Sequence, residues 1–507
     1  MVLLWQDIKY YLPSLKIFNP GFKSLMLALG IIIIYSIFFF FIILFSLGQL
    51  ALLITFLTFR NKENPKITLN TYPNITIQLP IYNERYVIER LLDSISNLNY
   101  PKNNLEIQVL DDSDDDTSIL AEQKVKELIA SGFTISQIKR ENRIGFKAGA
   151  LQNGLIQAKS EFIAIFDADF VPEPDFLINT IPYFSNDNIG MVQTRWGHIN
   201  PRESWLTRAQ EVGLNSHFII DQDGRAKGGF FISFNGTAGI WRKACIEDAG
   251  GWEADTLTED LDLSYRAQMK GWKFKYCPEI ISPAELPNLL SAVRSQQFRW
   301  IKGGVETSKK LIARLWNCNL PLSIKLFGSL QLLNNYIYAF VLLTGLLSVP
   351  LMLLKNKSRE FDLYFNWSGM LLIVLIINFF YCFTAILMDK KKIIASIKEI
   401  LSAFPIAIIV SMGMSYHNSI AVLKGIQGQK TAFVRTPKFN ESKRENPYLK
   451  SQKLRQYIPE FLLFIYFLLA AIAGLYFKDF AFLIYHLLML TGFGFILYCA
   501  FEESSGQ

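Results

Sequence analysis

Cysteine is scarce in this chain of 507 residues, and the few cysteines present are too widely separated to form a site together. Their positions match neither a metal site nor a disulfide framework (Cys245, Cys277, Cys318, Cys382 and Cys499). Zinc-finger, helix-turn-helix and RNA-binding signatures are also missing, and the basic residues behind the net charge of +7 gather beside apolar segments. We therefore expect no nucleic acid partner and attribute the positive charge to attraction to a membrane surface.

Charged residues are absent from 24–59, where only Gln49 interrupts a run of apolar residues, Gly, Ser, Thr and Tyr. A helix over this run would be about 54 Å long, which is longer than the hydrocarbon core of one bilayer. The run is too long for a signal peptide and lacks a cleavage pattern of small residues. It predicts one long, tilted or protruding transmembrane helix, with a tight hairpin as the alternative, in an integral membrane protein.

Four later apolar runs are also long enough to cross a membrane; they cover 327–354, 367–388, 461–477 and 480–501. The shorter run 401–414 lies between two basic flanks, 390–392 and 424–455. Because basic flanks favour the cytoplasmic side, we expect this run to lie along the membrane. The result is five crossings with the N-terminus outside. The loop 355–359 does not fit the rule that basic loops are cytoplasmic, because this topology places it outside the membrane.

Residues 60–325 have mixed polarity, and short apolar runs alternate there with helical patterns. We expect strands at 75–79, 107–110 and 162–166, and a helix whose apolar residues lie between 87 and 95. This order predicts an α/β doubly wound sheet, in which ligands bind at the carboxyl ends of the strands. Basic, aromatic and apolar residues alternate in 291–325, which predicts amphipathic helices on the cytoplasmic membrane face.

Two carboxylates follow the third predicted strand, with only Ala168 between them. Because alternate side chains of an extended segment point the same way, Asp167 and Asp169 can converge on one ion. Oxygen ligands of this kind suit Mg²⁺ or Mn²⁺. The alternative is an ordinary turn after the strand, which Pro172 and Pro174 would favour.

Four clusters now stand in chain order: Asp111-Asp112, Asp167-Ala168-Asp169, Thr258-Glu259-Asp260 and Gln296-Gln297-Phe298-Arg299-Trp300. Their order and spacing resemble glycosyltransferase family 2. The resemblance is to its processive membrane branch, which includes cellulose synthases, hyaluronan synthases and plant cellulose-synthase-like mannan and glucan synthases, the last of which are the most similar. It covers roughly residues 25–500 and is dense from 75 to 305. It implies a cytoplasmic domain of the GT-A type, doubly wound and Rossmann-like, inserted between transmembrane helices.

The resemblance also implies roles for individual residues. Asp260 corresponds to the general base, and Glu259 and Asp112 accompany it in the catalytic centre, while Asp167 and Asp169 hold Mg²⁺ or Mn²⁺. The residues expected to bind the donor are Pro80, Tyr82, Glu84, Asp112, Lys147, Asp167, Gln296 and Arg299. The residues expected to bind the acceptor are Trp300, Asn235, Gly236 and Thr237.

Taken alone, several of these residues have a simpler interpretation. Asp260 suits the cap of a following helix, and Trp300 suits an interfacial aromatic residue. The acidic run 111–116 could be a solvated loop, although we favour a role for Asp112 within it. His198 and His217 are interpreted as structural, because nothing pairs them with a nucleophile.

A basic segment near the C-terminus resembles the gating loop of cellulose synthases, which crosses the site entrance when donor is bound. The matching residues are Phe433, Arg435, Thr436 and Lys438. Arg435 stands where the bacterial pattern has valine, which puts the detail of gating in doubt. The alternative is a basic, proline-stiffened cytoplasmic loop.

The resemblance implies an inverting, metal-dependent, processive β-glycosyltransferase that elongates a β-glucan or β-mannan from UDP-glucose or GDP-mannose and translocates it across the lipid bilayer. It would lie in a plasma, inner or Golgi-type membrane. The alternatives are a transferase acting once on a lipid such as ceramide, and a transporter or scaffold with a degenerate domain. The expected divisions are 1–59 (first transmembrane segment), 60–290 (catalytic domain), 291–325 (interfacial helices), 326–389 (two transmembrane helices), 390–456 (interfacial helix and gating-like loop) and 457–507 (two transmembrane helices and tail).

Overall fold

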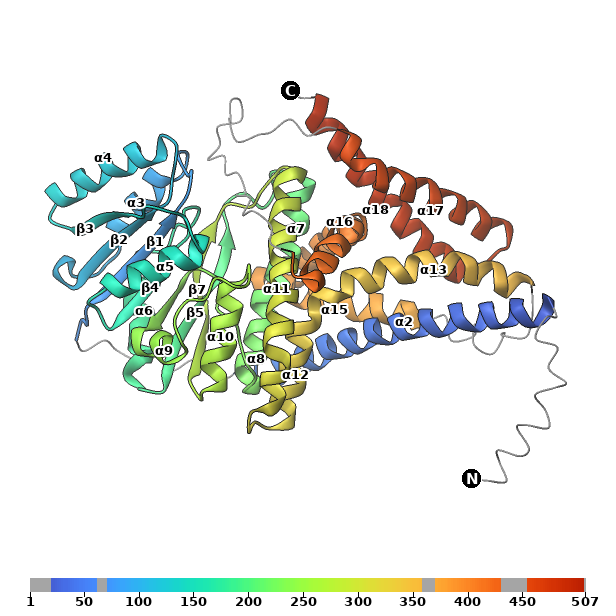
Figure 1. The fold of residues 1–507 in the computed structure, drawn as a ribbon, viewed down its shortest axis with the longest axis horizontal. Coiled ribbons are helices and arrows are strands. Elements are labelled where there is room, and N and C mark those ends of the chain that lie inside the picture. The colour runs from blue at the N-terminus through green and yellow to red at the C-terminus, as the bar shows by residue number, and fades with distance from the viewer. Residues whose placement is uncertain (1–19, 62–70, 358–369, 430–453, 506–507) are drawn as a thin grey trace.

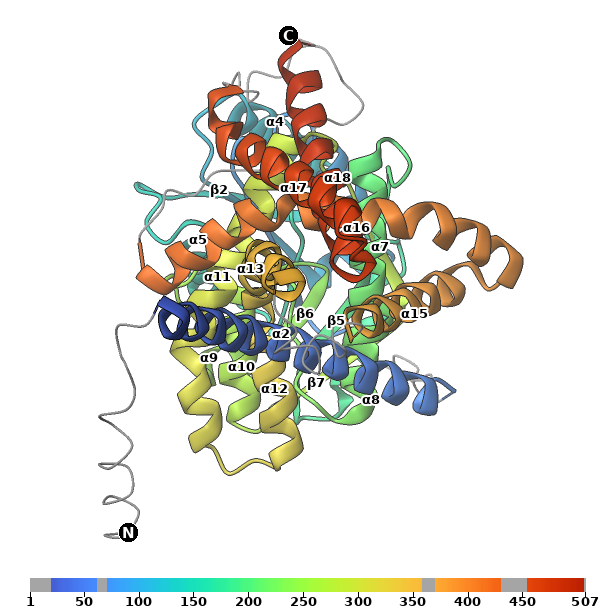
Figure 2. The same cartoon turned by 90° about the vertical axis from the view of Figure 1, so that its right-hand side faces the viewer.

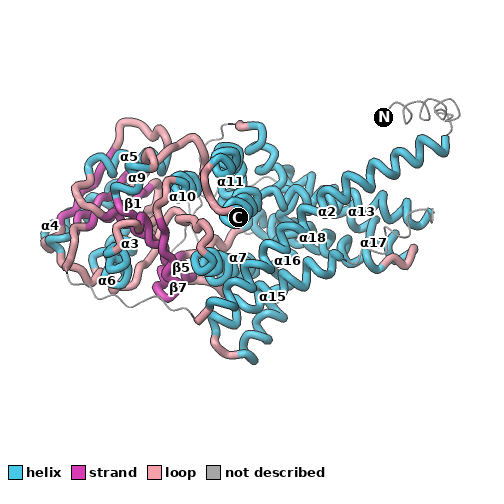
Figure 3. The backbone as a smooth tube through the Cα atoms, turned by 90° about the horizontal axis from the view of Figure 1, so that it is seen from below, coloured by secondary structure: helices cyan, strands magenta, loops and turns pink. Residues whose placement is uncertain are grey.

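The computed structural model describes residues 20–61, 71–357, 370–429 and 454–505. Its strands gather at one end of the molecule and its long helices at the other (Figure 1; Figure 3). Two helices, α7 (Trp205–Ser216) and α11 (Leu290–Asn317), lie between these parts. The predicted combination of an α/β domain with long apolar helices is therefore confirmed. The predicted gating loop at 433–438 lies outside the described residues.

One half of the seven-stranded sheet is parallel. In it, β1 (Ile75–Ile81) pairs with β2 (Leu105–Asp111) and β4 (Phe162–Ile165), and β2 pairs with β3 (Thr134–Lys139). Three of these strands, β1, β2 and β4, are the predicted ones. The strand at the sheet edge, β3, escapes prediction because polar residues interrupt its apolar ones. Parallel pairing brings the loops after β1, β2 and β4 to one edge of the sheet.

The other half of the sheet is mixed, and its strands are not among those predicted. It contains β5 (Ile189–His198), β6 (Gly239–Arg242) and β7 (Lys273–Ala284), in the overall order β3-β2-β1-β4-β6-β5-β7. Antiparallel pairing joins β6 to β4 and β5, whereas β7 is parallel to β5. The strand β6 is not predicted because it has only 4 residues. The strand β7 is not predicted because it contains prolines, which are tolerated at a sheet edge.

The sheet is covered on both faces, which explains why β4 is a continuous apolar run. Phe162 and Ala164 face a core shared with α3 (Ile88–Ser96), α4 (Thr117–Ala130) and α6 (Phe176–Thr180). Ile163 and Ile165 face a second core shared with α5 (Phe146–Gln157), α9 (Lys243–Asp248) and α10 (Glu259–Met269). No residue of β4 is more than 5% exposed. The predicted doubly wound architecture is confirmed.

Six helices in the described part of the chain are long and apolar enough to cross a membrane. The first, α2 (Pro20–Phe59), is one continuous helix, so the hairpin alternative for this run is wrong. The second apolar run contains α12 (Leu322–Leu333), a short 3₁₀ turn and α13 (Ile337–Lys357). The remaining long helices are α15 (Met370–Lys390), α16 (Ile393–Gln427), α17 (Ile458–Tyr476) and α18 (Phe480–Ser505). Figure 2 views the molecule from the side of these helices.

The run 401–414 is not a separate short helix. It forms the middle of α16, which continues for 35 residues. This helix is among the six that are long enough to cross a membrane, whereas five crossings are predicted from the sequence. The sequence underestimates its length because polar residues flank the apolar run on both sides. Its placement along the membrane stays a prediction.

The apolar stripe of α11 packs inside the protein. Ile301 and Val305 contact residues of α16, and Leu311 and Leu315 pack with Tyr265 and with residues of α12. This part of the predicted surface helix is therefore held between the α/β domain and the long helices. As a result, the residues of the fourth predicted cluster, which lie on α11, occupy a fixed position relative to the sheet.

Ion pairs connect the α/β domain to the long helices. Arg208 and Arg202 lie 2.9 Å and 3.3 Å from the carboxylate of Glu399 on α16, and Arg195 pairs with Asp389 at the end of α15. Residues 355–357 of the predicted basic loop belong to the last turn of α13, where Lys355 lies 2.8 Å from Asp479, the residue before α18. The charge of Lys355 is therefore partly balanced where it stands.

Candidate active site

One cleft at the carboxyl ends of the strands brings the predicted clusters together. It is lined by nearly all of the predicted site residues that the structure describes: Pro80, Tyr82, Glu84, Asp112, Lys147, Asp167, Asp169, Asn235, Gly236, Glu259, Asp260, Gln296, Arg299 and Trp300. They come from the ends of β1, β2 and β4, from the start of α5, from the segment before β6, from the start of α10 and from α11. Residues more than two hundred positions apart in the chain thus meet in one site.

The Asp-Ala-Asp segment is held in place by its neighbours. The ammonium of Lys147 donates hydrogen bonds to Asp167 Oδ1 (2.5 Å) and to the carbonyl of Gly236 (2.9 Å). The backbone N–H of Asp167 donates to the hydroxyl of Thr237 (2.8 Å). The two carboxylates therefore stand beside a fixed positive charge, and their oxygen atoms are the ligand type that suits Mg²⁺ or Mn²⁺.

Thr237 does not line the cleft, which contradicts its expected place in the acceptor site. Its side chain is fully buried, and its hydroxyl accepts the hydrogen bond from Asp167. The sequence groups it with Asn235 and Gly236, but alternation along the chain turns it the other way. It therefore positions the Asp-Ala-Asp segment.

Glu259 and Asp260 begin α10 and face the cleft. Burial, together with the charge of Glu259, raises the pKa of Asp260 to about 7, and burial also raises the pKa of Glu259. Burial alone would lower the pKa of Lys147, but Asp167 and Glu259 outweigh it, so its pKa is raised and the ammonium stays charged. A carboxyl with a pKa near neutrality beside a fixed cation is suited to general base catalysis.

The helix-cap interpretation of Asp260 finds little support. The cap position belongs to Thr258, whose side chain makes no capping bond and lies 2.9 Å from the hydroxyl of Thr307. Within the described residues, the carboxylate of Asp260 accepts one hydrogen bond, from the N–H of the next residue, Leu261 (2.8 Å). Gly236 lies against Asp260: a Cβ there would lie 3.1 Å from Asp260 Oδ2, and the φ of +82° also favours glycine.

Arg299 brings a guanidinium into the acidic part of the cleft. Burial lowers its pKa, and the nearby carboxylates of Asp167 and Glu259 act in the opposite direction. Gln296 and Trp300 of the same helix line the cleft as well. This arrangement places a planar cation close to two carboxylates, where it can bind the phosphates of a ligand.

Two arginines that the sequence analysis did not single out contact Asp112 and Tyr82, which line the cleft. Arg140 pairs with Asp112, with one contact of 2.9 Å. The guanidinium of Arg143 lies 3.2 Å from the ring centre of Tyr82. Asp112 is therefore paired with a cation, and its expected roles in the catalytic centre and in donor binding stay predictions. The basic run that follows β3 was the only signal for these arginines.

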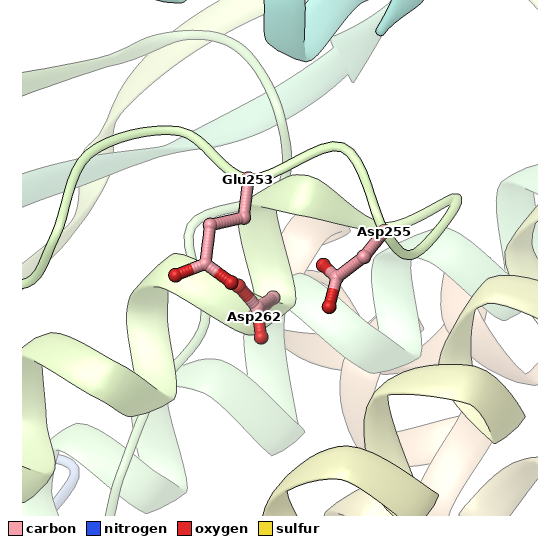
Figure 4. A group of neighbouring side chains, drawn as sticks. All are labelled: Glu253, Asp255 and Asp262. Carbon is pink, nitrogen blue, oxygen red and sulfur yellow. The ribbon is translucent and has the colours of Figure 1, made fainter.

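A second group of carboxylates could be mistaken for a metal site. Glu253, Asp255 and Asp262 turn their side chains towards one another (Figure 4). However, the ammonium of Lys310 lies 2.5 Å, 2.8 Å and 2.9 Å from them, and Arg266 lies 2.7 Å from Asp262. These cations already balance the cluster, which ties α11 to α10.

Comparison with known proteins agrees with this geometry. Residues 73–303 match the family described as "Glycosyltransferase like family 2". Glucomannan 4-beta-mannosyltransferase 2 of Arabidopsis thaliana is 41% identical over 258 residues, covering 50% of this chain and 48% of the relative. Glucomannan 4-beta-mannosyltransferase 1 of Oryza sativa subsp. japonica is 39% identical over 265 residues, covering 50% of both. The chain thus spans about half the length of the curated relatives it matches.

A solved structure supports the fold. The mannosyltransferase from Pyrobaculum calidifontis, in complex with GDP-Man and Mn²⁺, superposes with a TM-score of 0.53 at 17% identity. The match covers 78% of this chain and 100% of that one. The sheet, the cleft at its carboxyl edge and the matched relatives lead to one conclusion: the central domain of this chain, residues 73–303, is similar to glycosyltransferase family 2 and has the GT-A fold.

Proposed function

We propose that this protein transfers mannosyl units from GDP-mannose to the end of a growing β-linked polysaccharide, with UDP-glucose as the alternative donor. The observation that carries the proposal is the meeting of Asp167, Asp169, Lys147, Arg299 and Asp260 in one cleft. The names of the relatives, glucomannan 4-beta-mannosyltransferases, support mannose as the sugar. The GDP-Man bound to the Pyrobaculum protein supports the choice of nucleotide.

The residues of the cleft suit a single displacement at the anomeric carbon. Asp260 removes the proton from the acceptor hydroxyl, whose oxygen forms the new bond while the bond to the diphosphate breaks. Arg299 and Lys147 bear the positive charge that stabilises the departing diphosphate. A divalent cation held by Asp167 and Asp169 would add Lewis-acid stabilisation to the same leaving group. One displacement inverts the anomeric centre, so an α-linked donor gives a β-linkage.

The long helices are compatible with export of the polysaccharide across the membrane. Six of them in the described part of the chain are long and apolar enough to span a bilayer, and α7 and α11 lie between them and the sheet. We propose that the catalytic domain is cytoplasmic, in a plasma, inner or Golgi-type membrane, and that the polymer passes outward through these helices.

The proposal is tested with detergent-purified full chain, Mn²⁺ and, in turn, GDP-mannose, UDP-glucose, UDP-galactose and UDP-N-acetylglucosamine. We expect sustained nucleotide release from GDP-mannose, a product retained on dialysis, and loss of activity when EDTA removes the metal. Sustained turnover of UDP-glucose alone would identify a glucan synthase instead. Turnover that requires added ceramide would identify a lipid glycosyltransferase. No turnover of any donor would favour a transporter or scaffold.

The pH dependence of transfer should follow the carboxyl of Asp260. Because its pKa is raised to about 7, this group is protonated, and inactive as a base, below neutral pH. We expect kcat/KM, which reports the free enzyme, to rise about tenfold between pH 6 and pH 8 and then to level off. Glu259→Gln removes the negative charge that helps to raise this pKa, so the midpoint should move to lower pH. A profile that is flat over this range would contradict the assignment.

A further inference from the structure

Three nitrogen atoms in the cleft have no hydrogen-bond partner among the described residues. They are the indole nitrogen of Trp196, Nε2 of His198 and the amide nitrogen of Asn235. Each atom is buried, and all three residues line the cleft. Because an unpaired buried donor costs free energy, a native structure that keeps several in one place calls for a ligand that pairs with them.

Trp196 and His198 are presented on the same side of β5. They are alternate residues near its end, so their side chains point to one face and stand about 6.7 Å apart along the strand. The indole of Trp196 is fixed by Phe170 and Phe218, whose ring centres lie 5.2 Å and 5.0 Å away. A side-chain hydrogen bond with Asn215 holds His198. Both groups are therefore oriented before any ligand binds.

His198 is suited to hydrogen bonding rather than to carrying charge. Burial, with the charge of Arg195, lowers its pKa to about 4, so its imidazole is neutral over the working pH range. Trp196 likewise offers an uncharged N–H. Uncharged hydrogen-bonding groups beside aromatic rings match the hydroxyl groups and apolar faces of a sugar better than they match a phosphate.

The amide of Asn235 is oriented by a chain of polar contacts behind it. Its oxygen accepts from Gln222 Nε2 (3.3 Å) and lies 3.2 Å from His217 Nε2. The other ring nitrogen of His217 lies 3.2 Å from Asp221, which also accepts from Arg225 (2.8 Å). With the amide oxygen engaged by these contacts, the amide nitrogen is the atom of Asn235 that has no partner among the described residues, and the residue lines the cleft. His217 and Asp221 lie in a π-helical turn (His217–Gln222), a feature that often occurs at functional sites.

The same amide lies close to the expected base. Asn235 directly precedes Gly236, whose carbonyl accepts from Lys147 and whose Cα hydrogen faces Asp260. The three residues that carry the unpaired nitrogens therefore line the same cleft as Asp260.

We propose that Trp196 and His198 extend the acceptor site predicted at Asn235, so that together they bind the hydroxyl groups of the acceptor sugar chain, and that His217 and Asp221 position Asn235 in it. This inference rests on the proposed function and deepens it. The spacing of Trp196 and His198 requires an acceptor with hydroxyls spread over more than one position, as in an oligosaccharide. The hydrocarbon chains of a ceramide would leave these donors unpaired.

The test measures acceptor binding without turnover. Mannotetraose and cellotetraose are titrated calorimetrically into the detergent-purified full chain with GDP and Mn²⁺ present. We expect Trp196→Phe and His198→Phe, which keep a ring but remove the nitrogen, each to raise the Kd of the preferred tetrasaccharide by about 3- to 10-fold. Trp205→Phe is the matched control, because Trp205 lies exposed on α7, outside the cleft. The Tm of each variant shows whether folding is intact.

The outcomes separate this inference from the proposed function. Wild-type protein that binds neither tetrasaccharide, or variants that bind as well as the wild type, would overturn the acceptor site even if GDP-mannose is turned over. Weaker binding by the two variants would support the site even if the donor assay identified another sugar nucleotide.

The positioning role of His217 is tested separately, by measuring tetrasaccharide binding in single and double variants. If His217 acts through Asn235, then His217→Ala should weaken tetrasaccharide binding in the wild-type background but not in an Asn235→Ala background. Additive effects of the two substitutions would show that His217 acts elsewhere and would overturn its assigned role. Asp221→Asn, which keeps a hydrogen-bonding group of the same shape, should retain most of the binding that Asp221→Ala loses.

Discussion

Asp260→Asn is expected to lower the transfer rate by about 10²- to 10⁴-fold, because asparagine cannot accept the proton of the acceptor hydroxyl. The substitution keeps the size of the side chain, and its amide oxygen can still accept the N–H of Leu261. Asp167 and Lys147 remain paired with each other. Donor affinity and metal affinity should therefore stay within about twofold of the wild type.

The measurement is a single-turnover assay of transfer, combined with a separate titration of donor. Asp187→Asn is the matched control, because the Asp187 side chain is 99% exposed and lies outside the cleft. A variant as active as the wild type would remove the base assignment. A fall in Tm that parallels the fall in rate would show instead that Asp260 stabilises the start of α10 and that the loss of rate follows from unfolding.

The chemistry of the site was more predictable from the sequence than the shape of the sheet around it. Asp167 and Asp169 follow a run that is apolar on both faces, and such a run occurs where helices cover both sides of a sheet. The parallel pairing of β1, β2 and β4 then places the loops that follow them at one edge. Local sequence therefore carries enough information to place these carboxylates together.

The parts that escaped prediction depend on contacts between distant segments. β7 contains prolines that argue against a strand, yet its position at the sheet edge tolerates them. Asp112 has a partner, Arg140, only because β2 and β3 are neighbours in the sheet. His198, interpreted as structural from the sequence, lines the cleft because the end of β5 lies beside the segment that follows Asp169. The residues next to these positions in the sequence do not indicate which distant segments they contact.

The two carboxylates of the Asp-Ala-Asp segment should respond differently to substitution, because only Asp167 is hydrogen-bonded to Lys147. Asp169→Asn removes one expected metal ligand, so the Mn²⁺ concentration for half-maximal activity should rise by about 10- to 100-fold, with partial recovery at high Mn²⁺. Asp167→Asn also removes the partner of the Lys147 ammonium, which retains the carbonyl of Gly236. Its kcat should fall by about 10²- to 10³-fold even at saturating metal.

Titration of activity with Mn²⁺ in metal-depleted buffer distinguishes these two effects. Glu253→Gln is the control, because the Glu253 cluster is already balanced by Lys310 and should not contribute to the metal requirement. If Glu253→Gln shifted the Mn²⁺ titration and Asp169→Asn did not, the metal would belong to that second cluster. If Asp167→Asn recovered fully at high Mn²⁺, its carboxylate would act only as a metal ligand. Incomplete recovery would show that its contact with Lys147 also serves the leaving diphosphate, since the ammonium is placed in the cleft by that carboxylate.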